Sequence, residues 1–423
     1  MESILLEDNK HWFDSSCYDS YIERNILSKA LEFLHTKEIL AIIGARRVGK
    51  STLSKLMIRE LLKEVNSKNI FFINLEKPEF IPFKEDASYL QKIFDEYIKL
   101  ANPNLQEKIY FFIDEIQIFS NWEVFIKSKY ENSNIKFIIT GSNSSLLTSN
   151  YATVLTGRVI KLKLNSFSFK EFLQYKNIDI SSKLLRVKNK IDIKRAFDEY
   201  IKWGGYFSVI SNSNEEIKKE ILKNIAEDII LKDIVPRYNI KNSSQIRDMF
   251  FYIVSNATNI VNYSTLSTKL GIDAKTVKEY INYFEDNFLI TKISNYHNKL
   301  SEQIKSAKKI YINDNGFLNL SISQNRNFGI NLENLVFNYL YEHDENITYV
   351  KDKYEIDFFS KNSMYQVSFN ISDETTRKRE LNAFKHFDSL KNSQKILITY
   401  DYNETNEDIQ IISFDNFILD NNL

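Results

Sequence analysis

The chain has 423 residues, of which 43% are apolar, enough to fill the cores of two to four domains. Basic and acidic residues number 56 each, so no overall charge attracts the protein to nucleic acid or to an anionic membrane, and such binding would require a local patch. The single cysteine, Cys17, excludes an internal disulfide framework, and no apolar run has the length of a membrane span, so we expect a cytoplasmic protein with no membrane partner.

Helical and β-rich patterns alternate along the first part of the chain. Residues 1–35 predict a helical lead-in, because apolar side chains recur at helical spacing over residues 20–36. From residue 36 to residue 165, short β-rich runs such as IFFINLE and KIYFFIDEIQ alternate with helical stretches. This alternation predicts a parallel sheet with helices on both faces.

A glycine turn, GARRVGKS from Gly44 to Ser51, connects the first of these strands to a helix. Gly44 and Gly49 allow backbone amides to wrap phosphates, and the helix N-terminus adds partial positive charge. We expect Lys50 to reach the β- and γ-phosphates and Ser51 to supply an oxygen to Mg²⁺. The pattern predicts a nucleoside-triphosphate site, with Thr52 as a second hydroxyl near the α-phosphate.

An acidic pair, Asp114 and Glu115, ends a later apolar strand. We expect Asp114 to hold Mg²⁺ and Glu115 to act as the general base for the attacking water. Arg158, in LTGRVI, fits two roles: it neutralises charge on a transferred phosphoryl group, or it forms an ordinary surface ion pair. Arg46 and Arg47 lie inside the glycine turn, and three alternatives stay open for them: contact with phosphate, contact with a neighbouring subunit, or no contact.

Five stretches together resemble the successive motifs of a large prokaryotic family of AAA+-related ATPases that is linked to the signalling STAND class. They are GARRVGKSTL, FFIDEIQIFSNWE, FIITGSNSSLL, LTGRVIKLKLNSFSFKEFL and KWGGYF. The resemblance implies ATP binding with Mg²⁺ and slow hydrolysis. It also implies a γ-phosphate sensor at the end of the third strand, for which Thr140, Ser142 and Asn143 are candidates. We select Asn143, although Ser142 and Asn143 equally fit a helix N-cap.

The same resemblance implies an α/β fold with four modules after the lead-in. Residues 36–165 would form the P-loop NTPase sheet of the AAA+ type, and residues 166–240 a helical lid. Residues 241–320 would form a winged helix, and residues 321–423 an α/β domain resembling restriction endonucleases. The sequence departs from the family at GGYF, where a proline commonly follows the aromatic residue.

The expected winged helix offers two functions. A second helix that exposes Lys275, Thr276 and Lys278 would fit a DNA major groove. The lysines expected to touch DNA phosphates from the following β-ribbon are Lys299, Lys305, Lys308 and Lys309. That helix has no arginine for reading guanine, and winged helices in ATPases also serve as lids or protein-contact modules. DNA contact and protein contact therefore both stay open.

The C-terminal region follows the helix and strand order of a PD-(D/E)XK nuclease. Glu333 lies on the expected helix, and Asp357 lies on a hairpin that turns at residues 360–363. Gln366 and Ser368 stand where the nuclease requires a carboxylate and a lysine. Losing that carboxylate removes an attraction for the metal on the order of 4 kcal/mol at an effective dielectric of 20. We therefore expect a degenerate site in which Asp357 is a solvated strand acid.

Three further side chains fit a partial rescue of that site. Glu355 shares a strand face with Asp357, and Lys351 or Lys353 would take the lysine role. The histidines have no partners at metal-ligand spacing and are expected at the surface: His11, His35, His297 and His343.

These features predict an ATP-binding, slowly hydrolysing switch whose nucleotide state repositions the winged-helix and nuclease-like modules. Two classes of output stay open: recruitment of a protein partner, and action on DNA as a binder or as an ATP-regulated, metal-dependent nuclease. Oligomer formation also stays open, because Arg158 fits a phosphate of its own subunit or of a neighbour.

Overall fold

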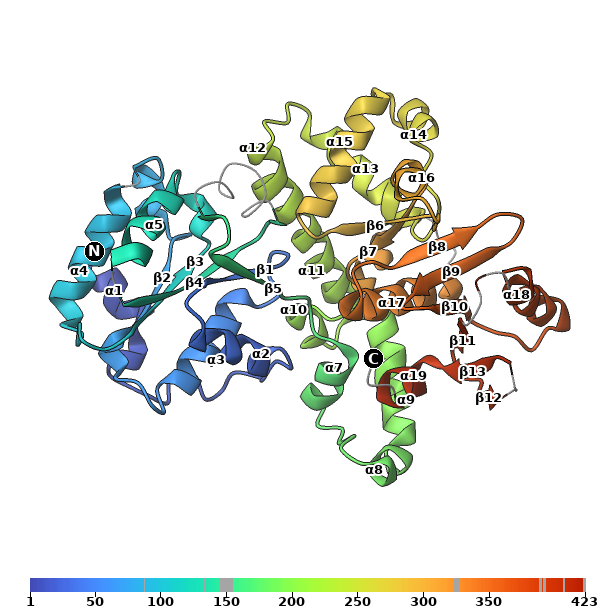
Figure 1. Ribbon diagram of the computed structural model, residues 1–423, viewed down its shortest axis with the longest axis horizontal. Coiled ribbons are helices and arrows are strands. Elements are labelled where there is room, and N and C mark those ends of the chain that lie inside the picture. The colour runs from blue at the N-terminus through green and yellow to red at the C-terminus, as the bar shows by residue number, and fades with distance from the viewer. Residues whose placement is uncertain are drawn as a thin grey trace. The chain divides into compact units, whose positions relative to one another are not determined.

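Two units make up the chain, Met1–Asn165 and Ser166–Leu423 (Figure 1). The computed structural model describes residues 1–86, 88–132, 134–144, 155–322, 327–387, 390, 393–405 and 408–420. The end of the third quoted motif, residues 145–147, lies outside the described residues. Within the described ranges, no helix combines the length and the apolarity that crossing a membrane requires.

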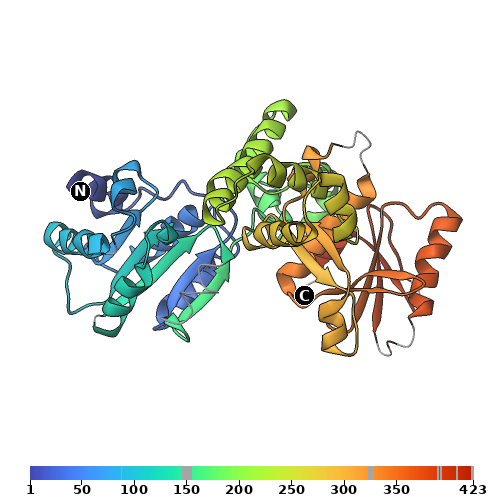
Figure 2. The same ribbon diagram turned by 90° about the horizontal axis from the view of Figure 1, so that it is seen from above.

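The first unit is built on a parallel sheet. Its helices are α1 (Glu2–Asp8), α2 (Leu27–Glu32), α3 (Lys50–Leu61), α4 (Ser88–Ala101) and α5 (Trp122–Asn132). Its strands are β1 (Ile39–Ile43), β2 (Ile70–Asn74), β3 (Ile109–Asp114), β4 (Ile135–Gly141) and β5 (Val159–Lys163). The strands pair in parallel in the order β2-β3-β4-β1-β5, and Figure 2 shows β5 beside β1. The predicted parallel sheet is confirmed.

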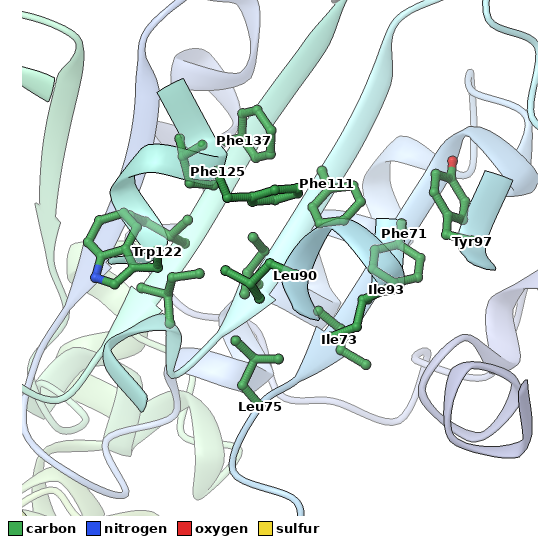
Figure 3. Packing of buried hydrophobic residues seen from close by; sticks show 14 of the residues in the cluster. Phe71, Ile73, Leu75, Leu90, Ile93, Tyr97, Phe111, Trp122, Phe125 and Phe137 are labelled. Atoms are coloured by element: carbon green, nitrogen blue, oxygen red, sulfur yellow. The ribbon is translucent and has the colours of Figure 1, made fainter. Parts of the chain in front are cut away.

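An aromatic-rich core lies between this sheet and the helices α4 and α5. Phe71, Phe111 and Phe137 come from three neighbouring strands, and Tyr97 and Trp122 come from the two helices (Figure 3). All five side chains are almost fully buried. Because each strand of a doubly covered parallel sheet is apolar on both faces, its residues appear in the sequence as continuous apolar runs.

The N-terminal segment covers the outer edge of β2. The Asn9 amide donates to the Phe72 carbonyl at 2.8 Å, and its oxygen accepts from the Phe72 amide at 2.7 Å. His11 Nε2 lies 3.0 Å from the Ile70 carbonyl, and its Nδ1 lies 3.2 Å from the Tyr18 hydroxyl. Burial lowers the pKa of His11 to about 4. The prediction of a surface position for His11 is therefore wrong, because an edge strand needs hydrogen-bond partners.

The second unit begins with helices. They are α7 (Phe169–Tyr175), α8 (Lys183–Lys188), α9 (Lys190–Trp203), α10 (Phe207–Ile210), α11 (Glu215–Asp228), a π-helical turn (Ile229–Ile234), α12 (Val235–Arg237) and α13 (Ser243–Ser255). Gly205 donates its amide to Asp314 Oδ2 at 2.9 Å, and Ser166 Oγ donates to the same oxygen at 2.5 Å. A Cβ on Gly204 would lie 1.9 Å from the Asp314 carboxylate, so only glycine fits where this backbone meets Asp314.

A helix-turn-helix and a β-ribbon follow. The helices are α14 (Tyr263–Leu270) and α15 (Ala274–Asp286). The left-handed Gly271 ends the first helix, and Asp273 caps the second by accepting from the Lys275 amide. β6 (Ile290–Ser294) pairs with β7 (Lys308–Ile312), and α16 (Leu300–Lys305) lies between them in sequence. The predicted elements are present, with α16 as an addition to the ribbon.

The C-terminal region forms a mixed sheet with the order β12-β13-β11-β10-β9-β8. Its strands are β8 (Thr348–Lys351), β9 (Glu355–Ser360), β10 (Ser363–Ser368), β11 (Gln394–Thr399), β12 (Glu404–Thr405) and β13 (Gln410–Ser413), and its helices are α17 (Phe328–His343), α18 (Glu374–His386) and α19 (Phe414–Asp420). Lys361 and Asn362 form the hairpin turn with positive φ, and Ser360 pairs with Ser363. The predicted hairpin and its register are confirmed.

Candidate functional site

The glycine turn holds its lysine at the start of α3. Lys50 is 4% exposed, and its ammonium donates to the Gly44 and Ala45 carbonyl oxygens at 3.2 and 3.1 Å. Gly49 has a φ of 100°, and Arg47 also has a positive φ, of 66°. A non-glycine residue in this region stores backbone strain. The strained turn and the helix N-terminus together present the backbone geometry that receives phosphates in P-loops.

A buried arginine from outside the turn, Arg24, donates hydrogen bonds that fix the turn in place. Arg24 donates to the Val48 carbonyl at 3.0 Å and to the Asn165 carbonyl at 2.8 Å. A Cβ on Gly44 would lie 2.2 Å from the Leu164 carbonyl oxygen, so glycine is required where the turn meets the end of β5. The turn is therefore held from both sides, by Arg24 and by the chain that follows β5.

The first acid of the pair is tied to two hydroxyl groups. Asp114 ends β3, and its carboxylate accepts from Ser51 Oγ and from Thr140 Oγ1, each at 2.6 Å. Burial and, after it, the neighbouring Glu115 carboxylate raise the pKa of Asp114 to about 6, although the two hydroxyls and Lys50 act to lower it. Thr140, a sensor candidate, thus supports the acid pair, since it also accepts from the Glu115 amide at 3.0 Å.

Glu115 is held by a cation and an amide. Its Oε1 lies 3.3 Å from the Lys50 ammonium, and its Oε2 accepts from Gln117 Nε2 at 2.5 Å. Gln117 Nε2 also lies 3.3 Å from Ser142 Oγ, beyond the end of β4. Burial is the largest single influence and favours the neutral acid, but Lys50, Gln117 and Arg46 together outweigh it, so the pKa of Glu115 is lowered. Glu115 is therefore an ionised carboxylate at the mouth of the turn.

The oxygens of Ser51 and Asp114 suit a magnesium ion. Both are hard oxygen donors, and their 2.6 Å separation brings them within reach of one cation. Mg²⁺ usually binds proteins through one or two such ligands and keeps several waters. Thr52 is half-buried in the first turn of α3, and Asn143 is fully buried just past β4, next to the strand that carries the glycine turn.

Arg158 lies at the other end of the sheet. It precedes β5, whose first residue pairs with Ile39 at the start of β1, whereas the glycine turn follows the end of β1. At about 3.3 Å per residue, the length of a five-residue strand is roughly 16 Å. Arg158 forms an ion pair with Glu131 at 3.1 Å and lies over the Tyr130 ring. Arg158 therefore lies at the edge of the sheet where the strands begin, whereas the glycine turn lies at the edge where they end. This separation excludes a contact between Arg158 and phosphates bound in its own subunit.

A second charged cluster lies in the C-terminal region. The Lys309 ammonium, on β7, contacts Glu333 on α17 at 2.8 Å, and Glu355 and Asp357 on β9 at 2.8 and 3.3 Å. Lys309 is 3% exposed, and the Tyr311 hydroxyl donates to Glu333 at 2.9 Å. Glu333 and Asp357, at the acid positions of the nuclease pattern, and Glu355, the candidate for partial rescue, thus surround an internal cation. No group of acids, histidines or cysteines in the described residues is arranged to hold a metal ion.

Asp357 is buried rather than solvated, so that part of the prediction is wrong. Its Oδ2 accepts from the Val367 amide at 2.9 Å. Burial, reinforced by the Glu333 carboxylate, raises the pKa of Asp357 to about 8. Gln366 donates to Glu380 on α18 at 2.7 Å and accepts from the Asp357 amide at 3.2 Å. Gln366 therefore links the hairpin to α18 by hydrogen bonds.

The lysines expected to contact DNA divide into two groups. Lys275 and Lys278 on α15 are exposed, as are Lys299 and Lys305 around α16. Lys308 instead donates within the ribbon, to Ser294 Oγ at 2.8 Å. Lys309 is enclosed by carboxylates, so the expectation that it touches phosphates is wrong. Of the rescue candidates, Lys351 pairs with Glu355 at 2.7 Å and leaves the central position to Lys309.

Sequence reasoning missed two residues of the nucleotide site. Arg24 precedes the strand that carries the glycine turn and has no motif around it. Gln117 lies two residues after the general-base candidate, in the quoted stretch FFIDEIQ, so its spacing was a usable signal. The position of Arg158 could also have been predicted. It comes just before a strand that is parallel to the strand leading into the glycine turn, so it must lie at the sheet edge away from that turn.

Comparison with known proteins identifies the first unit. Residues 36–173 match the family model of the AAA domain, and residues 194–327 match a domain of unknown function (DUF8612). An uncharacterized protein of Haemophilus influenzae is 33% identical over 396 residues, covering 90% of this chain and 94% of that protein. The chain belongs to its family. MJ1544 of Methanocaldococcus jannaschii, also uncharacterized, is 32% identical over 392 residues, covering 89% of this chain and 85% of that protein.

Two solved structures are more distantly similar. The Walker-type ATPase PABY2304 of Pyrococcus abyssi is 15% identical, with a TM-score of 0.43, and the match covers 71% of this chain and 96% of that one. Orc1 of Aeropyrum pernix, solved in complex with DNA, is 10% identical, with a TM-score of 0.33, and the match covers 72% of this chain and 93% of that one. The match of residues 36–173 to the AAA domain, together with the five-stranded parallel sheet, gives the first unit an AAA-type P-loop fold.

Proposed function

We propose that the protein binds ATP with Mg²⁺ and hydrolyses it slowly, and that the bound nucleotide controls the state of its C-terminal modules. The observation that carries this proposal is the convergence of Lys50, Ser51, Asp114 and Glu115 at one edge of a parallel sheet. Ligands of open α/β sheets bind outside the carboxyl ends of the strands, which is where these four side chains meet.

The nucleotide would be held by the glycine turn. Backbone amides from Gly44 to Ser51 and the N-terminus of α3 would receive the phosphates. Lys50 would exchange its carbonyl and carboxylate partners for the β- and γ-phosphates, which carry more negative charge. Thr52 and Asn143 are proposed as further nucleotide contacts, near the α-phosphate and the γ-phosphate respectively. Arg46 is instead paired with Glu76 at 2.7 Å.

Hydrolysis would depend on releasing Glu115. Its carboxylate is paired with Lys50, and the move of Lys50 onto phosphate would leave it as a base for water. Ser51 and Asp114 would hold Mg²⁺, which neutralises charge on the phosphate oxygens when bound. Gln117 would keep Glu115 oriented through its 2.5 Å hydrogen bond while Lys50 is engaged elsewhere.

Arg158 is proposed to act on a neighbouring subunit. It lies at the sheet edge opposite its own nucleotide, where only another copy's phosphates come within reach. Arginines supplied from a second subunit stabilise charge on a transferred phosphoryl group. A variant Arg158→Ala should then lower hydrolysis without weakening ATP binding, and hydrolysis per subunit should rise with protein concentration.

Two variants test the nucleotide proposal directly. Lys50→Ala should abolish ATP binding, and Glu115→Gln should retain binding but lose hydrolysis. Lys63→Ala removes an exposed lysine just beyond α3 and serves as the control. Equilibrium binding of a fluorescent ATP analogue and phosphate release are the two measurements. Normal binding and hydrolysis by Lys50→Ala would overturn the proposal.

For the output, we propose a protein-recognition role for the winged-helix module, residues 241–320, and for the degenerate nuclease-like module, residues 321–423. The Lys309 ammonium among Glu333, Glu355 and Asp357 supports this role, because a metal ion would have to displace an internal cation. A partner captured by Glu115→Gln only in the presence of ATP is the expected result.

Action on DNA is the second candidate, and one observation favours it. Lys275 and Lys278 are exposed on α15, in the position of a recognition helix. Binding to duplex DNA that weakens steeply with salt, and that is lost in Lys275→Gln/Lys278→Gln, would establish DNA contact. Plasmid cleavage with Mg²⁺ or Mn²⁺ that disappears in Asp357→Ala would establish a nuclease.

A further inference from the structure

A basic and apolar surface lies at the junction of α8 and α9. Three aliphatic side chains are strongly exposed there: Leu184 at 79%, Val187 at 66% and Ile191 at 68%. Large exposed aliphatic side chains so close together are uncommon in soluble proteins, and they mark sites of contact with other molecules. Figure 1 shows α8 at the end of the long helix α9. We name this surface, formed by residues 183–195, the α8 tip.

Positive charge surrounds these three side chains. Residues 183–195 contain six basic residues and one acidic residue, Asp192, in a chain whose total charge is zero. Lys183, Lys188 and Lys190 are exposed, and none of them forms an ion pair in the described part of the chain. The positive charge of the α8 tip is therefore largely available to an external partner.

Other charged side chains of the α8 tip contact groups within the protein, and one of them, Arg186, holds α8 in place. Arg186 donates to the Leu419 carbonyl and to the Asp420 carboxylate, each at 2.7 Å, which anchors α8 on α19. Arg195 lies 3.7 Å from Asp192. Because Arg186 faces inward, Leu184 and Val187 on the same helix remain exposed. The tip is a supported part of the fold that presents its apolar residues outward.

In contrast to the expectation from the sequence that the protein has no membrane partner, we propose that the α8 tip docks the protein on an anionic phospholipid surface. Aliphatic side chains flanked by lysines match the interface of such a membrane, where apolar groups enter the acyl boundary and ammonium groups meet phosphates. Nucleic acid would not use three exposed aliphatic side chains, since its contacts are phosphates and base edges. A membrane surface can also receive a short exposed helix without needing a groove on the protein. The docking is independent of the proposed ATPase activity.

The full-length protein is tested by sedimentation with two kinds of vesicles, phosphatidylcholine alone and phosphatidylcholine mixed with phosphatidylglycerol. We expect binding only to the mixed vesicles, and binding that weakens with salt. Lys183→Gln/Lys188→Gln/Lys190→Gln should weaken that binding by roughly a hundredfold. Leu184→Ser/Val187→Ser/Ile191→Ser should weaken it by at least about tenfold.

Two control variants match these changes elsewhere on the surface. Lys84→Gln/Lys92→Gln/Lys99→Gln lowers the net charge equally, and Leu300→Ser/Ile304→Ser removes aliphatic side chains of similar exposure from α16. Both should bind mixed vesicles as the unaltered protein does. Thermal unfolding should be unchanged in all four variants, because the substituted residues are exposed.

Three outcomes would overturn the proposal. The first is no binding to either kind of vesicle, and the second is equal loss of binding in the tip variants and in the controls. The third is binding to an acidic polypeptide, such as polyglutamate, without binding to mixed vesicles, which would instead assign the α8 tip to a protein partner.

Discussion

Lys50 and Lys309 are both buried and both contact carboxylates, but the groups around them differ. Lys50 is paired with Glu115 and otherwise donates to two backbone carbonyls, at the mouth of a turn built to receive phosphates. Lys309 contacts three carboxylates on two other elements of its unit. In the proposed function, a bound nucleotide would give Lys50 a more negatively charged partner. Lys309 already has its full complement of negative charge.

This difference explains why one acidic cluster is a candidate site of catalysis and the other is not. Asp114 and Glu115 lie beside a helix N-terminus and glycine backbone, which attract further anions. Glu333 and Asp357 instead contact the buried Lys309 ammonium, which balances their negative charge. A cluster of acids thus indicates chemistry only when its counter-ion can leave.

The largest expected effect comes from removing the enclosed cation. Lys309→Met would leave the acids Glu333 and Asp357 without this cation, whereas Glu355 keeps its contact with Lys351. We expect the change to lower the free energy of unfolding by about 3–5 kcal/mol. Lys351→Met is the matched control, because Lys351 meets Glu355 at the exposed rim, and it should cost less than about 1 kcal/mol. Denaturant unfolding measures both, and equal stability of the two variants would contradict the comparison.

The corresponding change at the glycine turn, Lys50→Met, should affect ATP affinity more than stability. Lys50→Met removes a contact with one carboxylate, where Lys309→Met removes contacts with three, so we expect a smaller stability loss than in Lys309→Met. ATP affinity should fall by at least about a hundredfold, because the lysine that meets the phosphates is gone. Denaturant unfolding and equilibrium ATP binding, measured on the same preparation, separate the two effects. A loss of stability as large as that of Lys309→Met would make the two clusters equivalent.

The pH dependence of stability should identify Asp357. Its pKa is raised by burial from 3.8 to about 8, so between those values the folded state binds more protons than the unfolded state. The free energy of unfolding should therefore fall as pH rises from about 4 to about 8, by up to 1.4 kcal/mol per pH unit. Asp357→Asn cannot titrate and should show a flatter slope. An unchanged slope would show that Asp357 is ionised throughout.

The smallest effect concerns the support of the glycine turn. Arg24→Ala removes the donors to Val48 and Asn165, and we expect ATP affinity to weaken by about tenfold. Arg24→Lys keeps the charge and one donor, so it should restore part of the affinity. Binding of a fluorescent ATP analogue measures both variants. If Arg24→Ala bound ATP as tightly as the unaltered protein, the turn would need no support from this residue.

Local chemistry made several features predictable. The hairpin register followed from a two-residue turn at Lys361 and Asn362, where both residues adopt positive φ. The helix-turn-helix followed from Gly271 and Asp273, which end one helix and cap the next. Each of these features depends on residues that are neighbours in sequence, so a single sequence contains the necessary information.

Long-range partners could not be predicted in the same way. His11 was expected at the surface, but it is buried against the edge of β2, 59 residues away in sequence. Gln366 was judged as a missing metal ligand, whereas it links Asp357 to Glu380. These side chains are polar, and a polar residue is compatible with the surface until a buried partner for it is known.

By itself, the sequence determined the glycine turn, the acid pair and the parallel sheet that carries both, because these features depend on backbone conformation and on short apolar runs. Only the tertiary structure decided which lysine neutralises which acids. Lys309 and Asp357 are 48 residues apart, and Arg24 and Asn165 are 141 residues apart. Electrostatic pairing depends on distance in space, and the packing of β7 beside α17 and β9 sets that distance.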